Sequence, residues 1–305
     1  MLKCKILYNK IEMEVILMIG LVDVGGGIRD VYGAGIYDYC LDHNITFPYC
    51  IGVSAGSGNL ASFLGKQRGR NLRFYKDYIN RKEYMSLSNL IHKGSYLDLE
   101  YVYGEMTNEG GEDPLAIDNL LSSGSTLTVV ATECSTGNPV YFNNKDFVRN
   151  DYGILKASCC IPIVCKPYKW HGHEYVDGGV SDPVPIKKAF SDGCDKVVLI
   201  LTRPLDYRDG EDKNLIFYRL IKKKYPKVYE RLLHNHEAYN EALDQVVNEY
   251  MPSGKVIVMA PDDCCGVDTL SRNQDEIQRL YDKGYADGEI LSEKLNINYE
   301  KTICH

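Results

Sequence analysis

Residues 21–30 read Leu-Val-Asp-Val-Gly-Gly-Gly-Ile-Arg-Asp, an apolar run that ends in three glycines. One βαβ unit later, a second short apolar run leads into residues 52–56, which read Gly-Val-Ser-Ala-Gly. Apolar runs that end on glycine are typical of buried parallel strands followed by sharp turns. The order of strand, glycine turn, helix, strand, sharp turn and helix predicts the start of a parallel α/β sheet.

The rest of the chain extends this alternating pattern, apart from residues 68–124, where weak periodicity predicts short helices and loops over the sheet. Residues 170–173 resemble a hairpin turn. Strands are expected over residues 16–24, 49–53, 127–134, 140–143, 197–201 and 256–260. Helices are expected over residues 31–42, 59–65, 147–158 and 273–295, and in much of 213–250.

The length of 305 residues fits one large α/β domain, or such a domain with an extension. Met18 opens a segment that would make a natural start, so we expect residues 1–17 to be an upstream extension. After residue 205 the chain becomes charged and largely helical, and we expect residues 206–305 to pack on the same domain.

Composition excludes some classes of protein. The net charge of −7 disfavours nucleic acid as a partner, because phosphate binding depends on clustered Lys and Arg. Residues 15–24 are apolar but too short to span a bilayer, and no cleavage site follows them. The eleven cysteines are odd in number and contain no C-x-x-C pair, so we expect reduced thiols and a cytoplasmic location. No calcium loop is visible, and we expect neither a metal nor an organic cofactor.

Ser54 stands at the centre of the Gly-Val-Ser-Ala-Gly turn. A serine hydroxyl is a weak nucleophile unless a base takes its proton and the turn presents its oxygen. Flanking glycines permit such a strand-to-helix turn, and the following helix directs its N-terminal N–H groups to the same place. The alternative is a serine that only caps a helix.

The three glycines at residues 25–27 supply a second element, since backbone without side chains can approach an oxyanion and direct N–H groups to it. A phosphate loop or a merely tight turn would use similar residues, but neither nucleotide-binding glycine pattern occurs here. Together the two segments predict an acyl-transfer site that still needs a base.

Histidine is the usual base, but no histidine has a local context that suggests this role. A metal site at residues 170–173 is a weak alternative, because no further ligand cluster accompanies the two histidines there. Asp177 ends an extended segment, and the glycines that follow leave its carboxylate reachable. An aspartate that only caps a turn is the alternative interpretation. The seven histidines are His43, His92, His171, His173, His234, His236 and His305.

Taken in order, these motifs resemble those of the patatin-like phospholipases. The resemblance covers residues 18–205, the expected catalytic domain. It implies a three-layer α/β/α fold with a central, mostly parallel sheet and a helical C-terminal extension. The segments that carry it are Gly25–Arg29, Gly52–Gly56, Ser158–Pro162, Asp177–Gly179 and Val180–Pro185, while Gln67–Asn71 resembles an uncharacterised bacterial branch.

The resemblance also implies roles for single residues. Ser54 would be the nucleophile and Asp177 its base, in a Ser–Asp dyad that replaces a triad. Backbone N–H groups of Gly26, Gly27 and Ala55 would form the oxyanion hole, with Arg29 beside it. The remaining motif glycines are Gly25, Gly52, Gly56, Gly178 and Gly179.

Asp30 departs from the family pattern, in which a glycine follows the basic residue. A carboxylate at this place would either repel an oxyanion or pair with Arg29, and we expect the ion pair. Asp30 is also the one feature that favours a non-catalytic acyl-lipid binding protein of the same fold.

The expected activity is hydrolysis of an acyl ester or phospholipid through an acyl-enzyme, with acyltransferase or general carboxylesterase activity as alternatives. The segment Arg219–Lys227 is basic and flanked by aromatic residues in an otherwise acidic protein. It suggests transient contact with anionic lipid headgroups, although a solvated helix face would look the same.

Overall fold

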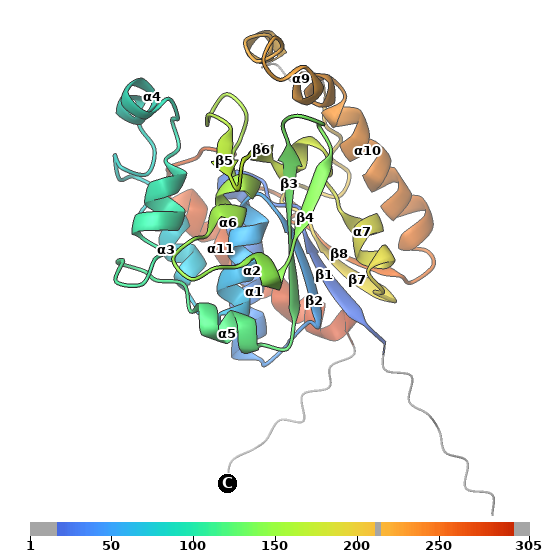
Figure 1. The fold of residues 1–305 in the computed structure, drawn as a ribbon. Helices are drawn as coiled ribbons and strands as arrows, with labels where there is room; N and C mark the ends of the chain where they lie inside the picture. Colours follow the sequence, from blue (N-terminus) through green and yellow to red (C-terminus); the bar gives the residue numbers. More distant parts are fainter. Residues whose placement is uncertain (1–16, 211–214, 296–305) are drawn as a thin grey trace, which may run out of the picture.

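A single mixed sheet organises the fold (Figure 1). The computed structural model describes residues 17–210 and 215–295, and within them eight strands join in the order β5-β6-β3-β2-β1-β7-β8, with β4 paired to β3. β1, β2, β3, β7 and β8 are parallel, while β4, β5 and β6 join by antiparallel pairing. The strands are β1 (Ile19–Asp23), β2 (Tyr49–Val53), β3 (Thr126–Glu133), β4 (Pro139–Phe142), β5 (Tyr168–Trp170), β6 (His173–Asp177), β7 (Lys196–Ile200) and β8 (Val256–Met259).

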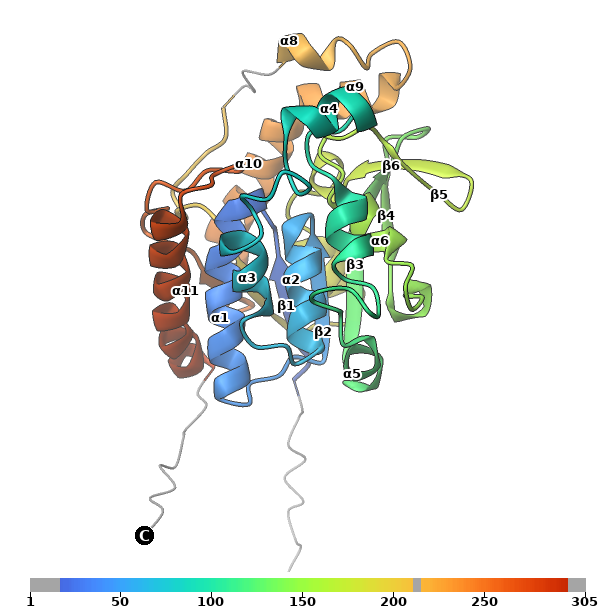
Figure 2. The same cartoon turned by 90° about the vertical axis from the view of Figure 1, so that its left-hand side faces the viewer.

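Helices cover both faces of the sheet (Figures 1 and 2). Leu21 and Val22 are neighbours on β1, and because strand side chains alternate, they are buried in separate apolar clusters on opposite faces. The Leu21 cluster includes α1 (Val31–Asp42), α2 (Ala55–Leu64), α3 (Arg70–Lys76) and α11 (Gln274–Lys294). The Val22 cluster includes α7 (Ile186–Ser191) and α10 (Asn235–Gln245). The expected three-layer α/β/α fold with a mostly parallel sheet is confirmed.

The other helices are short and lie towards the ends and edges of these layers. They are α4 (Leu87–Lys93), α5 (Ile117–Ser122), α6 (Gly153–Ser158), α8 (Leu215–Tyr218) and α9 (Pro226–Leu233), with single π turns at Tyr101–Glu105 and Val246–Tyr250 and 3-10 turns at Gly27–Asp30, Asn144–Asp146 and Gly178–Val180. The short helices and loops expected over residues 68–124 are thereby confirmed. In the part of the chain that the structure describes, no helix combines the length and the apolar character needed to cross a bilayer.

Residues after 205 complete the same layers. β8 pairs in parallel with β7 at the sheet edge, and α11 packs along α1. The two helices approach so closely that a Cβ on Gly284 would lie 2.0 Å from the carbonyl oxygen of Tyr32. Glycine is required at such a contact because any side chain would displace the neighbouring backbone.

Three predicted element boundaries need correction. α2 begins at Ala55, directly after Ser54, and not at residue 59. The helix predicted over residues 147–158 begins only at Gly153, because Asn150 has a positive φ of 63° and Val148 pairs back with Asp151. β1 begins at Ile19, while residue 16, most of the predicted upstream extension and residue 213 lie outside the described residues.

Gly284→Ala is expected to lower the free energy of unfolding of the whole protein by about 1–3 kcal/mol, the usual range for overpacking. The measurement is urea unfolding followed by circular dichroism. Glu289→Ala, on the exposed face of the same helix, is the matched control and should change stability by less than about 0.5 kcal/mol. Two results would contradict the proposal that residues 206–305 pack on the same domain. One is an unchanged free energy of unfolding in Gly284→Ala, and the other is a separate unfolding transition for the C-terminal region.

Candidate active site

Ser54 lies at the carboxyl end of β2, in the turn that leads into α2. Its backbone has φ 54° and ψ −129°, a region that non-glycine residues rarely occupy and that costs about 1–3 kcal/mol. A Cβ on Gly52 would lie 2.7 Å from the backbone of Ser57, so the turn closes only because glycine stands there. The Ser54 N–H donates to Ser158 Oγ at 2.9 Å. The strained turn therefore holds the Ser54 side chain clear of the backbone.

The glycine loop of residues 25–27 lies directly against this turn. All three glycines have positive φ, and a Cβ on Gly25 would lie 3.2 Å from the Cβ of Ser54. Among the described residues, the N–H groups of Gly26, Gly27 and Ala55 donate to no acceptor. Free N–H groups beside a serine side chain are the requirement for stabilising an oxyanion.

Asp177 ends β6 and lines the same cleft as Ser54. Its Oδ1 accepts a hydrogen bond from the N–H of Gly179 at 2.8 Å, while Oδ2 has no donor among the described residues. Burial raises the pKa of Asp177 to about 6, and the nearby hydroxyl of Ser54 and the N–H of Gly179 lower it. The Ser54 hydroxyl is near enough to lower the pKa of Asp177, but the two side chains form no hydrogen bond among the described residues.

The predicted ion pair between Arg29 and Asp30 is wrong. Asp30 is fully buried behind the glycine loop and packs beside the carboxyl group of Asp23. Burial, together with the charge of Asp23, raises the pKa of Asp30 well above its usual value. Neither carboxyl oxygen of Asp30 has a hydrogen-bond partner among the described residues. Burial and the raised pKa both disfavour a negative charge on Asp30 behind the loop.

Arg29 instead points into the cleft and bonds to the segment before α11. Its Nη1 donates to Asp268 Oδ1 at 3.1 Å and to Thr269 Oγ1 at 2.8 Å. The carbonyl of Thr269 also accepts the N–H of Ile28 at 3.0 Å. A segment far along the chain thus fixes the outer side of the glycine loop. No sequence motif marked Asp268 or Thr269 as part of the site.

Two cavities meet at Ser54. A narrow one, of about 70 Å³, runs between α2, α3 and the residues around α4. A wider, more polar cleft of about 660 Å³ opens on the other side. Ser54 and Gly27 line both, and Asp177 and Arg29 line the cleft. The narrow cavity is lined mainly by apolar and aromatic side chains, among them Ile28, Phe74, Met85, Leu97, Leu99 and Val102.

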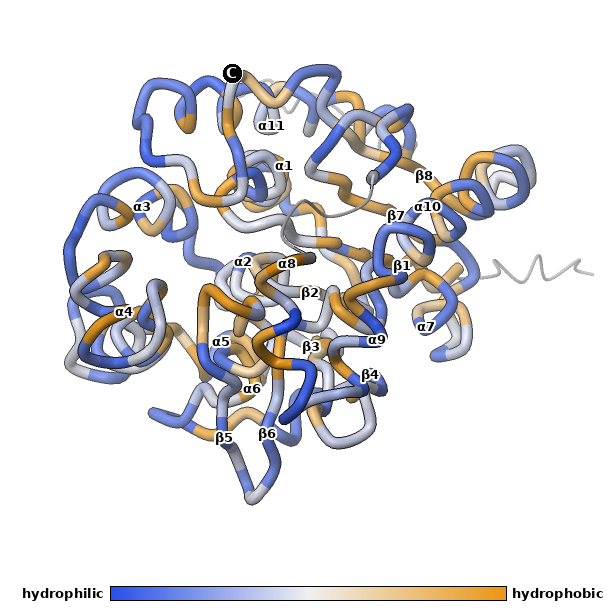
Figure 3. The backbone as a smooth tube through the Cα atoms, turned by 90° about the horizontal axis from the view of Figure 1, so that it is seen from above, coloured by the Kyte–Doolittle hydropathy of each residue, from blue (hydrophilic) through white to orange (hydrophobic). Residues whose placement is uncertain are grey.

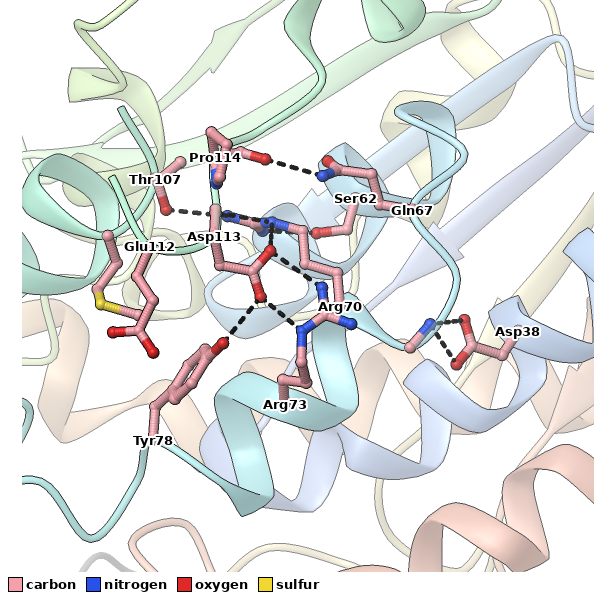
Figure 4. Close-up of polar contacts among 12 residues, drawn as sticks. Asp38, Ser62, Gln67, Arg70, Arg73, Tyr78, Thr107, Glu112, Asp113 and Pro114 are labelled. Carbon is pink, nitrogen blue, oxygen red and sulfur yellow. Dashed lines mark hydrogen bonds and ion pairs between the residues drawn. The ribbon is translucent and has the colours of Figure 1, made fainter. Parts of the chain in front are cut away.

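A buried ion-pair network supports the wall of the narrow cavity (Figure 4). Asp113 accepts two hydrogen bonds from Arg73, at 2.7 and 3.0 Å, and one from Tyr78 at 3.2 Å. Arg70 lines the cavity and lies 3.4 Å from the same carboxylate. Burial lowers the pKa of Arg70 to about 10, and the charge of Asp113 opposes this shift. The paired charges fix α3 against residues 107–114.

The structure brings the predicted residues of all three motifs into one site. Ser54, Asp177, Arg29 and the glycine loop line one cleft. The chain can turn away after Asp177 because the next residue is Gly178, where a Cβ would lie 2.2 Å from the carbonyl oxygen of Val130. No described histidine lines either cavity, and the hairpin predicted at residues 170–173 is confirmed by β5 and β6. The described residues contain no group of three side chains placed to hold a metal ion.

A comparison with protein families agrees with this arrangement. Residues 22–190 match the model of a family described as patatin-like phospholipase. The chain belongs to the patatin-like phospholipases. Membership supports, in general terms, a lipid hydrolase with lipid substrates. A second match, over residues 225–296, is to a domain of unknown function (DUF6363) and includes β8 and α11.

Individual relatives give less detail than the family. The uncharacterized protein YjjU of Escherichia coli strain K12 is 30% identical over 191 residues, which make up 61% of this patatin-like chain and 52% of that protein. The chain thus spans about half the length of that curated relative. The crystal structure of VipD from Legionella pneumophila aligns with a TM-score of 0.45 and 12% identity over 90% of this chain and 67% of that one.

Proposed function

We propose that this patatin-like protein is a serine lipid acyl hydrolase of the phospholipase A or esterase type that acts through an acyl-enzyme. The observation that carries the proposal is the position of the Ser54 hydroxyl. Ser54 neighbours both the buried Asp177 carboxylate and the glycine loop with its free N–H groups, and it lines both cavities. Nucleophile, base and oxyanion donors then occupy one place.

The reaction follows from this arrangement. Asp177 accepts the Ser54 proton while Oγ attacks the ester carbonyl carbon, and the N–H groups of Gly26, Gly27 and Ala55 stabilise the oxyanion. Collapse breaks the bond to the alcohol, which leaves with the proton from Asp177. Water then attacks the acyl-enzyme and gives a proton to Asp177. The second collapse returns that proton to Ser54 Oγ and releases the fatty acid.

The two cavities suggest how a lipid ester would lie. The acyl chain would point into the narrow cavity, because its lining is mainly apolar and aromatic, and the cavity would widen to admit it. The alcohol portion fits the open cleft, where Arg203 is available to an anionic headgroup and Arg29 is already held by Asp268 and Thr269. Asp177, Asp209 and Asp268 line the same cleft, so its charge is mixed.

The place of Asp30 supports the enzyme over the non-catalytic alternative, which depended on Asp30 as a carboxylate beside the oxyanion hole. Asp30 is buried behind the loop, and burial raises its pKa well above the usual value. Acyltransferase and general carboxylesterase activity would use the same residues with another acceptor or a simpler ester. The cytoplasmic location and the absence of a cofactor stay predictions from the sequence.

Ser54→Ala should abolish hydrolysis of p-nitrophenyl butyrate and labelling by a fluorophosphonate probe, because the attacking oxygen is gone. Asp177→Asn should lower kcat/KM by about 10²–10⁴-fold, the usual contribution of a general base. Ser253→Ala, at an exposed position between Tyr250 and β8, is the control and should keep full activity and labelling. Turnover by Ser54→Ala at the wild-type rate would refute the proposed nucleophile.

The pH dependence should report the ionisation of Asp177. Only the ionised carboxylate can accept a proton, and its pKa is about 6 in the folded protein. We therefore expect kcat/KM for the neutral ester to rise with pH through about 6 and then level off. Burial also raises the pKa of Asp38, which contacts Gly69 and Tyr281 and lines neither cavity, so Asp38→Asn is the control and should leave the midpoint unchanged. A flat profile in the wild type, or a midpoint lost in Asp38→Asn, would exclude Asp177 as the base.

A further inference from the structure

Large apolar side chains gather on two exposed segments of the described chain. α4 exposes three of them, at 69%, 41% and 77%, and residues 216–220 expose another three, at 66%, 51% and 76%. Isolated exposed apolar residues need no explanation, but groups of three do. We call these six side chains the docking face: Leu87, Leu90, Ile91, Ile216, Phe217 and Leu220.

Both segments lie at the same end of the molecule. Figures 1 and 2 place α4 and α8 at the top, beyond the carboxyl ends of the parallel strands, where Ser54 also lies. Figure 3, which looks down on this end, shows apolar residues in α8 over the middle of the fold and in α4 to one side. The docking face is therefore on the side from which the site is reached.

Each segment borders one of the two cavities at Ser54. Met85 and Leu97 pair on either side of α4, and both line the narrow cavity. Tyr218, the last residue of α8, lines the open cleft. The exposed apolar groups are thus continuous with the walls of the route to Ser54.

Charge indicates what covers this face. Arg219, Lys222 and Lys223 are exposed, and none of the ion pairs among the described residues includes them. Lys224 lies 3.6 Å from Glu174, a contact that water largely screens. In a chain with a net charge of −7, this local excess of positive charge beside exposed apolar groups fits an anionic lipid surface.

We propose that the docking face, with the basic residues at 219–224, binds reversibly to an anionic lipid bilayer. The apolar side chains would enter the boundary between headgroups and acyl chains, and the basic side chains would contact the headgroups. The site would then open towards its lipid substrate. This proposal rests on the proposed function for its purpose, but the binding itself requires no turnover.

The test is co-sedimentation of the full chain with vesicles, using Ser54→Ala so that the lipid stays intact. We expect binding to vesicles of equal parts phosphatidylcholine and phosphatidylglycerol, and weak binding to phosphatidylcholine alone. The pair Phe217→Ser and Leu220→Ser should weaken binding by about tenfold or more, because apolar insertion is lost. The triple change of Arg219, Lys222 and Lys223 to Gln should remove the preference for anionic lipid.

Leu121→Ser is the matched control, because Leu121 is also exposed but lies on α5 at the opposite end of the molecule. It should leave vesicle binding unchanged. Equal binding to both kinds of vesicle, or wild-type binding by the Phe217 and Leu220 variant, would overturn the docking proposal. So would a dimer in ultracentrifugation that the Phe217 and Leu220 changes dissociate, because a second copy would then cover the face.

Hydrolysis of a soluble ester separates this proposal from the proposed function. With Ser54 intact, the docking-face variants should hydrolyse p-nitrophenyl butyrate at the wild-type rate. A wild-type protein that hydrolyses the ester but binds neither kind of vesicle would overturn docking alone. A wild-type protein could instead bind vesicles normally but hydrolyse no ester and react with no fluorophosphonate. That result would overturn the proposed hydrolase function and would still support bilayer binding by the docking face.

Discussion

The buried carboxylate of Asp23 joins the three backbone segments that make the site. Its Oδ1 accepts the N–H of Gly25 at 2.9 Å and so fixes the start of the glycine loop. Its Oδ2 accepts the hydroxyl of Tyr37 at 2.6 Å, which ties the loop to α1. A Cβ on Gly56 would lie 2.5 Å from the same carboxyl group, so the turn after Ser54 rests directly on it. The proposed oxyanion donors and the serine are therefore held in register by one side chain.

This arrangement has a cost for the fold. Burial raises the pKa values of Asp23 and Asp177 to about 6 and raises that of Asp30 well above its usual value. A carboxyl group with a raised pKa binds its proton more tightly in the folded than in the unfolded chain. These groups therefore destabilise the fold as pH rises above about 4, and the loss for Asp23 and Asp177 is complete above about 6. Apolar packing on both faces of the sheet offsets this loss.

Much of the fold could be predicted from sequence because its strands are short apolar runs that end on glycine. The helix over residues 31–42 and the strand over residues 49–53 were predicted with the observed bounds. The helix predicted over residues 147–158 was too long, because periodicity does not register a single residue such as Asn150 with positive φ. The first turn of α2 was missed because its glycines and serines disfavour a helix unless packing requires one.

The candidate site was predictable where it depends on backbone motifs and unpredictable where it depends on distant contacts. Ser54, Asp177 and the glycines stand in short motifs whose geometry is local. The partner predicted for Arg29 was wrong. Proximity in the sequence favoured Asp30, whereas the observed partner, Asp268, lies 239 positions away. Nothing in the sequence linked Asp23 to Asp30, since the partnership of two buried carboxyl groups exists only after folding.

The central claim is that the glycine loop and Asp177 serve the same serine. Its most direct test is a crystal structure of the protein after reaction with a phosphonate analogue of the transition state. The account predicts phosphorus bonded to Ser54 Oγ, its charged oxygen within hydrogen-bond distance of the N–H groups of Gly26 and Gly27, and Asp177 beside Oγ. A phosphonate on another residue, or an oxygen directed to solvent away from the loop, would contradict it.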